Sequence, residues 1–180
     1  PGFGGSCFNK DILNLIYICN YYGLHEVAEY WEGVIKINKW QKNRITKIIL
    51  RKLFGTVAEK QIAILGFAFK ANTNDTRESP AIKICNDLIN EGAKLKIYDP
   101  KVNKKQIEID LKLKESQNLK SSDSGSWIYS PTIQDAAKGV DGIIILTEWY
   151  EFKNINWHEI SKYSRKPTWL FDSRNISNAE

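Results

Sequence analysis

The residues with the clearest capacity for chemistry lie in the first eleven positions of the chain, where three glycines surround a cysteine thiol. Glycine lets the backbone adopt positive φ angles and lets a ligand approach it closely. Cys7 stands where this loop runs into an apolar segment, residues 12–16. A thiol in the first turn of a helix lies at the positive end of the helix dipole, which stabilises the thiolate. The pattern therefore predicts a nucleophile presented by a glycine-rich turn.

The groups that could activate this thiol are few. A cysteine–histidine hydrolase needs a partner imidazole, and the spacing of His25 and His158 supports neither as that partner. Lys10 and Asp11 follow Cys7 within about one helical turn, so they lie near the thiol. The alternative is that Cys7 is an inert buried side chain, as many cysteines are. The glycine-rich approach favours the reactive thiol.

The composition narrows the class of protein. The 180 residues are 42% hydrophobic and 26% charged, with a net charge of +5, which is ordinary for a globular domain that binds an anionic small molecule. Basic residues are too dispersed for a nucleic-acid partner, and no apolar run is long enough to cross a membrane. Cys19 and Cys85 lie on apolar faces and are predicted to be core residues. No metal site is expected, and the cytoplasm is the expected compartment.

Two helices are predicted in the first third of the chain, at residues 9–22 and 26–54. The second carries a broad apolar stripe at helical spacing and is longer than most globular helices. The stripe indicates core packing, a subunit interface or a spine between two domains. Gly33 in its middle should cost about 1 kcal/mol relative to alanine unless a neighbour packs closely there.

From residue 61 onward the pattern changes to strands that alternate with helices, which is typical of a doubly wound α/β domain. Strands are expected at residues 61–65, 94–98, 127–129, 142–147 and 168–172. Helices are expected at residues 81–90, 133–138 and 157–163, the first of them capped by Ser79. Residues 107–113 alternate between apolar and polar, so we predict a short edge strand there; residues 116–126 are predicted to be a surface excursion.

Ligands of open parallel sheets bind outside the carboxyl ends of the strands, and polar residues follow three of the expected strands. Lys70 and Arg77 follow the first strand, Asp99 the second and Arg174 the last. The three cations together favour a phosphate-bearing ligand, although each taken alone could simply pair with an acid on the surface. Gly66 stands alone after its strand, so the glycine fingerprint of a nicotinamide cofactor is absent and such a cofactor must bind mainly elsewhere.

Several stretches of the chain resemble, in order, the motifs of the UDP-glucose/GDP-mannose dehydrogenase family, and their wording is most similar to the UDP-glucose branch. They are residues 2–11, 64–70, 74–79, 98–101, 147–149 and 171–174. The resemblance implies an α/β protein in which long central helices precede a Rossmann-like parallel-sheet domain. Residues 1–55 would hold the catalytic loop and the central dimerisation helices, and residues 56–180 the UDP-binding domain. The family's amino-terminal NAD domain would lie outside this chain.

The resemblance also implies a reaction, the NAD-dependent oxidation of UDP-glucose to UDP-glucuronate in two steps. Cys7 would be the nucleophile that forms a thiohemiacetal and then a thioester at C6 of the sugar, and Asp11 would help to activate water. The substrate contacts implied are Phe3, Gly4, Phe69, Lys70 and Arg174. The positions implied to lie near the cofactor are Phe8, Asn9, Lys10 and Arg77.

Two alternatives stay open at this point. The chain could belong to a dehydrogenase of another nucleotide sugar, such as GDP-mannose or a UDP-N-acetylhexosamine. It could also be a non-catalytic nucleotide-binding and dimerisation module in which Cys7 is unreactive. Ala71, Asn72 and Ser173 depart from the family pattern and bear on the sugar contacts. Because the chain is expected to lack an NAD domain, the 180 residues alone are expected to produce no NADH from UDP-glucose.

Overall fold

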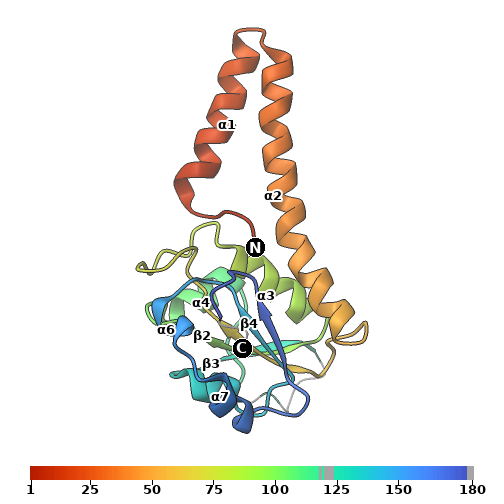
Figure 1. Ribbon diagram of the computed structural model, residues 1–180. Helices are drawn as coiled ribbons and strands as arrows, with labels where there is room; N and C mark the ends of the chain where they lie inside the picture. The colour runs from red at the N-terminus through yellow and green to blue at the C-terminus, as the bar shows by residue number, and fades with distance from the viewer. Residues whose placement is uncertain (118, 120–123, 178–180) are drawn as a thin grey trace.

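A computed structural model gives the fold and describes residues 1–117, 119 and 124–177. Two antiparallel helices, α1 (Ser6–Tyr21) and α2 (His25–Lys52), form a hairpin that projects from an α/β body (Figure 1). At about 1.5 Å per residue, the 28 residues of α2 span about 42 Å. The start of the chain lies where the hairpin meets the body, so the loop that carries Cys7 begins at this junction.

The hairpin is held by a small apolar core of its own. Its buried residues are Ile12, Ile16 and Cys19 of α1 and Ala28 of α2. Both predicted helices are confirmed, but α1 begins three residues earlier than expected, so that Cys7 is its second residue. Gly5 takes the N-cap position with φ of +86°, a conformation that a side chain would strain.

The body is built on a five-stranded parallel sheet in the order β3-β2-β1-β4-β5. The strands are β1 (Gln61–Leu65), β2 (Lys94–Tyr98), β3 (Ser126–Tyr129), β4 (Gly142–Ile145) and β5 (Trp169–Asp172). The strand order reverses between β1 and β4, and ligands of such sheets bind at the carboxyl ends of the strands beside this switch point. The expected α/β class and its parallel sheet are therefore confirmed.

Two groups of helices cover the sheet. The helices are α3 (Pro80–Asn90), α4 (Lys104–Leu111), α5 (Ile133–Ala137), α6 (Tyr150–Lys153) and α7 (Trp157–Tyr163). Helix α3 packs with α2 and α4, whereas α5 packs with α7 and strands β1 and β2. Ile49 and Leu53 at the end of α2 belong to the core of the body, so α2 spans both parts of the molecule. The division of the chain near residue 55 stays a prediction.

The predicted edge strand at residues 107–113 is wrong, because this segment lies in and after helix α4. Asn103 caps the helix by accepting a hydrogen bond from the Gln106 amide at 2.9 Å. Ile107 and Leu111, four residues apart, are buried on one helical face, while Ile109 is 58% exposed. The spacing of the apolar residues fits both the period of a strand and the period of a helix, and the Asn103 cap favours the helix. The short helix α6 was not predicted, and part of the expected surface excursion at 116–126 lies outside the described residues.

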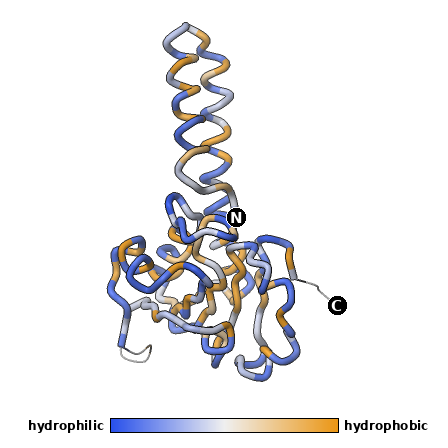
Figure 2. The backbone as a smooth tube through the Cα atoms, turned by 90° about the vertical axis from the view of Figure 1, so that its left-hand side faces the viewer, coloured by the Kyte–Doolittle hydropathy of each residue, from blue (hydrophilic) through white to orange (hydrophobic). Residues whose placement is uncertain are grey.

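Hydrophobic and hydrophilic residues alternate along both helices of the hairpin (Figure 2). Exposed apolar side chains of the hairpin include Tyr17, Tyr21, Tyr30, Ile37 and Trp40. Gly33 has open space beside it among the described residues, since a Cβ built there meets nothing within 4 Å. No helix of the described residues is long and apolar enough to cross a membrane.

Candidate functional site

The glycine loop is fixed onto the segment that follows β1. The Gly5 amide donates to the Arg77 carbonyl at 3.0 Å. A Cβ at Gly4 would lie 2.4 Å from the Glu78 carbonyl oxygen, and one at Gly5 would lie 2.9 Å from the Phe69 ring. Only residues without a Cβ allow this approach, so the glycines expected to admit a ligand here admit the protein's own Glu78 backbone and Phe69 ring. The loop thereby brings the start of α1 to the carboxyl edge of the sheet.

Helix α2 holds the same loop from the other side through Asn38. The Asn38 side chain accepts a hydrogen bond from the Phe3 amide at 2.9 Å and donates one to the Phe3 carbonyl at 3.2 Å. The Phe3 ring also meets Phe8 edge to face, with centroids 4.8 Å apart. Sequence analysis missed Asn38, because nothing in the sequence of a helix indicates that one of its asparagines hydrogen-bonds to the backbone of a distant loop.

Cys7 is exposed in the first turn of α1, at the positive end of the helix dipole. Lys10 and Asp11 lie three and four residues further along the helix, on the same side and also exposed. Arg77 pairs with Asp75, with 2.7 Å between its Nη2 and Asp75 Oδ2. The hydrogen bond to Asp75 raises the pKa of Arg77, and Cys7 adds to this effect, so Arg77 lies within electrostatic reach of the thiol. The structure thus brings these predicted residues together.

Asp99 lies at the expected edge but is used by the protein itself. Its side chain is buried and accepts five hydrogen bonds, from Trp149 Nε1 and from four backbone amides. These amides belong to Phe67 and Ala68 after β1 and to Lys101 and Val102 after β2. Both carboxylate oxygens are occupied, so Asp99 does not serve as the ligand-binding acid expected from its position. Its contacts fix the loops around the switch point.

The segment after β1 is held on its carbonyl side as well. Thr147 Oγ1 donates to the Ala68 carbonyl at 2.7 Å, and Ser79 Oγ donates to the Phe67 carbonyl at 2.8 Å. Both backbone amides and both carbonyls of this dipeptide are therefore satisfied while buried, which fixes the next residue, Phe69. Lys70 follows on the surface, with its Nζ 5.4 Å from the Phe69 ring centroid.

Arg174 joins three loops at the same edge. Its Nε donates to the Leu146 carbonyl at 2.8 Å, and its Nη2 donates to the Phe69 carbonyl at 3.3 Å. Burial lowers the pKa of Arg174, and the nearby Glu148 carboxylate acts in the opposite direction. With 20% of its side chain exposed, Arg174 is a partly desolvated cation beside the Phe69 loop.

Sequence analysis also missed Glu148, although it too follows a strand at the ligand edge. Its Oε2 lies 3.1 Å from Arg174 Nε, and its Oε1 accepts a long hydrogen bond of 3.5 Å from the Ala71 amide. Glu148 could have been identified as Asp99 was, as an acidic residue directly after a strand.

Asp172 fixes the turn that carries Arg174. Its side chain accepts hydrogen bonds from the Arg174 and Ile176 amides and from both the amide and the hydroxyl of Ser177. Partial burial alone would raise the pKa of Asp172, but these hydrogen bonds outweigh it and hold the pKa below its usual value. The turn is therefore held most firmly by the ionised carboxylate.

This pKa shift predicts acid-sensitive stability. A carboxyl whose folded pKa is depressed stabilises the fold above its unfolded pKa of about 3.9, and that contribution is lost as the pH falls through the folded value. We expect Asp172→Asn to lower the free energy of unfolding at pH 7 by about 1 kcal/mol after allowing for solvent screening, and by less at pH 3. Urea unfolding at both pH values measures this. Glu159→Gln, at an exposed acid, is the control; a gap that stays constant with pH would contradict the prediction.

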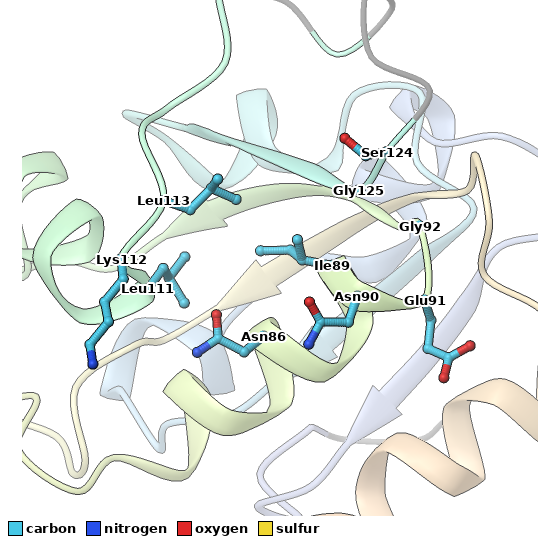
Figure 3. A pocket seen from close by; sticks show the side chains of 10 residues that line it. All are labelled: Asn86, Ile89, Asn90, Glu91, Gly92, Leu111, Lys112, Leu113, Ser124 and Gly125. Carbon is cyan, nitrogen blue, oxygen red and sulfur yellow. The ribbon is translucent and has the colours of Figure 1, made fainter.

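A pocket of about 640 Å³ lies away from these residues (Figure 3). Its lining includes Gly92 and Gly125, which precede β2 and β3, so it opens at the amino edge of the parallel sheet. The Cys7 thiol and Arg174 lie at the carboxyl edge of the sheet. We therefore do not assign the candidate site to this pocket. The described residues contain no group of three or more His, Cys, Asp or Glu side chains placed to hold a metal ion.

Comparison with known proteins places these motifs in one family. Residues 63–179 match the model of the UDP-glucose/GDP-mannose dehydrogenase family, UDP binding domain, and residues 1–40 match the central domain of the same family. UDP-glucose 6-dehydrogenase 4 of Arabidopsis thaliana is 47% identical over 98% of the chain, and UDP-glucose 6-dehydrogenase 1 of Glycine max is 47% identical over 99%. The chain spans 38% and 39% of the length of these relatives.

Solved structures agree with the fold. The UDP-glucose dehydrogenase of Pyrobaculum islandicum is similar with a TM-score of 0.75 and 25% identity, over 97% of this chain and 35% of that one. The UDP-D-ManNAc dehydrogenase of Pyrococcus horikoshii is similar with a TM-score of 0.72 and 28% identity, over 99% of this chain and 36% of that one. The resemblance noted in the sequence is confirmed, and the chain belongs to the UDP-glucose/GDP-mannose dehydrogenase family.

Proposed function

We propose that this chain supplies the thiol and the nucleotide-binding half of an NAD-dependent UDP-glucose 6-dehydrogenase, which oxidises UDP-glucose to UDP-glucuronate. The observation that carries the proposal is the attachment of the Cys7 loop to the segment after β1, through Gly4, Gly5 and Arg77. This contact brings an exposed thiol to the edge of the sheet where nucleotides bind. The identity with plant UDP-glucose 6-dehydrogenases favours UDP-glucose over other nucleotide sugars.

The cations at this edge suit a diphosphate. Arg174 is partly buried, and Lys70 is exposed on the loop that Arg174 binds through the Phe69 carbonyl. A desolvated guanidinium binds phosphate oxygens more strongly than one in water. We assign Lys70 and Arg174 to the diphosphate and the half-buried Phe69, with Phe3 and Gly4, to the rest of the substrate.

The covalent steps that we propose centre on Cys7. The thiolate adds to the C6 aldehyde to form a thiohemiacetal, loss of hydride gives a thioester, and water then releases the carboxylate and restores the thiol. We propose that Asp11, one helical turn from Cys7 on the same face, accepts a proton from the attacking water. A covalent aldehyde-level intermediate can be oxidised again without leaving the site.

The outward side of the first turn of α1 fits part of a dinucleotide site. Phe8 is 52% exposed, Asn9 and Lys10 flank it, and Arg77 presents a guanidinium with 70% of its side chain exposed. An exposed aromatic ring beside amide and cationic donors suits a nicotinamide nucleotide with its phosphates. We propose that these four residues contact NAD, which would accept one hydride in each of the two oxidations.

We also propose that the protein acts in the cytoplasm, because a reactive thiol such as that of Cys7 suits a compartment in which thiols are kept reduced.

We further propose that the central helices form a homodimer. Tyr30, Ile37 and Trp40 of α2 are each more than half exposed, and Gly33 between them has no close neighbour among the described residues. An apolar helix face of this extent usually marks an interaction site. The same proposal assigns residues 1–55 to the catalytic loop and dimerisation helices and residues 56–180 to UDP binding.

Alkylation of Cys7 tests the proposed function directly in the 180-residue chain. Cys19 and Cys85 are buried, so iodoacetamide at neutral pH should modify Cys7 selectively, as read by mass spectrometry. Burial also raises the pKa of the Cys85 thiol, which makes it less reactive. We expect rapid modification of Cys7 and a rate that falls at least about tenfold when saturating UDP-glucose covers the thiol.

The comparison ligands and the control variant sharpen this result. GDP-mannose and UDP-N-acetylglucosamine should protect Cys7 less than UDP-glucose at equal concentration, and Cys7→Ser should remove the modification altogether. Better protection by GDP-mannose would reassign the sugar nucleotide. Slow modification that no nucleotide sugar changes would instead indicate an unreactive thiol and a non-catalytic binding module.

A further inference from the structure

Asn38 lies on α2 between the two apolar cores that this helix joins. Val34 and Ile35 pack against the hairpin core, and Ile45 packs against the core of the body. Asn38 itself is half-buried beside the glycine loop, residues 2–5. Because apolar packing on either side of Asn38 holds α2 in place, the loss of this one polar side chain should leave the fold intact.

Asn38 binds Phe3 as the neighbouring strand of a sheet would. Its Oδ1 accepts from the Phe3 amide at 2.9 Å and its Nδ2 donates to the Phe3 carbonyl at 3.2 Å, so one side chain satisfies both backbone groups of that residue. Glycine loses more conformational freedom on ordering than any other residue, and three of the four loop residues are glycine. The loop is therefore ordered from outside, by Asn38 at Phe3 and by the Arg77 carbonyl at Gly5.

Gly2 fits closely over the Asn38 amide. A Cβ at Gly2 would lie 2.6 Å from Asn38 Oδ1 and 3.3 Å from Lys42 Cγ. The φ angle of Gly2, +93°, is also one that a side chain would strain. The loop thus follows the surface of α2 at Asn38 over two consecutive residues, Gly2 and Phe3.

Phe3 is linked to the thiol by its ring and by the backbone. Its ring meets that of Phe8 with centroids 4.8 Å apart, and Phe8 directly follows Cys7 in the first turn of α1. Along the backbone, three residues separate Phe3 from Cys7, and one of them, Gly5, is the N-cap of α1. We propose that Asn38 is a positioning residue for Cys7, which fixes Phe3 and thereby holds the thiol against the sugar of the bound nucleotide. This inference rests on the proposed function and adds the residue of α2 that sets the place of the thiol.

Alkylation of Cys7 at saturating UDP-glucose tests this role in the 180-residue chain. Saturation should slow alkylation at least about tenfold in the wild type but only about threefold or less in Asn38→Ala, because two lost hydrogen bonds let the loop move away from the sugar. Asn38 is not among the residues assigned to the diphosphate, so calorimetry should find the affinity for UDP-glucose within about threefold of the wild type. A lower protection at saturation with a similar affinity distinguishes a displaced thiol from a weakened site.

Two further variants complete the experiment. Asn43→Ala is the matched control, because Asn43 lies on the same helix but lines a depression beside Asp87 of α3; it gains the same helix propensity and should keep the full protection. Asn38→Asp fills the same space and can still accept from the Phe3 amide, but it sets an oxygen against the Phe3 carbonyl. It should therefore lose protection as Asn38→Ala does.

Each outcome decides the matter. Full protection at saturation in both Asn38 variants, each folded by circular dichroism, overturns the role of Asn38 and leaves the proposed function standing. Full protection with a much weaker affinity also overturns it, since Asn38 would then contribute to binding and not to the place of the thiol. A wild-type chain that UDP-glucose does not protect overturns the proposed function, and this role with it. The two failures are therefore distinguishable.

Discussion

Replacing Asp99 by alanine is expected to lower the free energy of unfolding by about 4 kcal/mol or more. The buried carboxylate accepts five hydrogen bonds, and its loss leaves Trp149 Nε1 and four backbone amides without their acceptor. Each stranded buried donor costs about 1–3 kcal/mol, with partial relief where water enters. Because Phe67 and Ala68 are among the four, the loop after β1 should loosen as well. Urea unfolding at pH 7 measures the loss.

Asp99→Asn separates hydrogen bonding from volume. The asparagine fills the same space but replaces one acceptor oxygen with an amide donor, so it should also be strongly destabilised. Glu159→Ala, at an exposed acid on α7, should stay within about 0.5 kcal/mol of the wild type. An Asp99→Asn variant as stable as the wild type would show that the five contacts do not hold the fold together.

Arg174→Ala is expected to reduce the affinity for UDP about 100-fold, as measured by calorimetry. The substitution removes a partly buried cation from the proposed diphosphate site, and charged hydrogen bonds are worth about 1.5–3 kcal/mol each. It also removes the donors to the Leu146 and Phe69 carbonyls, so the loop that carries Lys70 loses one of its attachments. Arg174→Lys keeps the charge without the fork of donors, and a loss of about tenfold is expected.

Arg165→Ala is the matched control for this experiment. Arg165 also pairs with an acid, its Nη1 lying 3.3 Å from Asp141 Oδ1, but Asp141 precedes β4 and Arg165 precedes β5, so the pair lies at the amino edge of the sheet. Its removal should leave UDP affinity unchanged. Equal affinity of Arg174→Ala and the wild type, with both folded by circular dichroism, would remove Arg174 from the nucleotide site.

Local patterns predicted most of the secondary structure. The apolar stripes in the first third of the chain fit only a helix, and the short buried runs after residue 61 fit only strands. They are therefore correctly assigned to α1, α2 and the strands. Residues 107–113 satisfy both periods, and only the Asn103 cap distinguishes them. That capping signal was present in the sequence and outweighs four alternating residues, because a cap satisfies a backbone donor that an edge strand would leave to water.

The candidate site could be predicted from the sequence only in part. The sequence indicated which side chains could react or carry charge, Cys7, Arg77 and Arg174 among them, because residue type and position after a strand are local properties. It could not indicate which polar groups the fold itself consumes. Asp99 and Arg174 follow strands in the same manner, yet one is saturated by backbone donors and the other stays partly open.

The sequence by itself determined which thiol is the candidate nucleophile, the helix that presents it and the parallel sheet with cations after its strands. It did so because glycine spacing, apolar periodicity and the alternation of strands with helices along the chain are local properties. Only the tertiary structure decided that the glycine loop contacts the chain at Glu78, that Asn38 clamps Phe3 and that Glu148 faces Arg174. Those contacts join residues between 26 and 74 positions apart by shape and burial, and no local pattern records them.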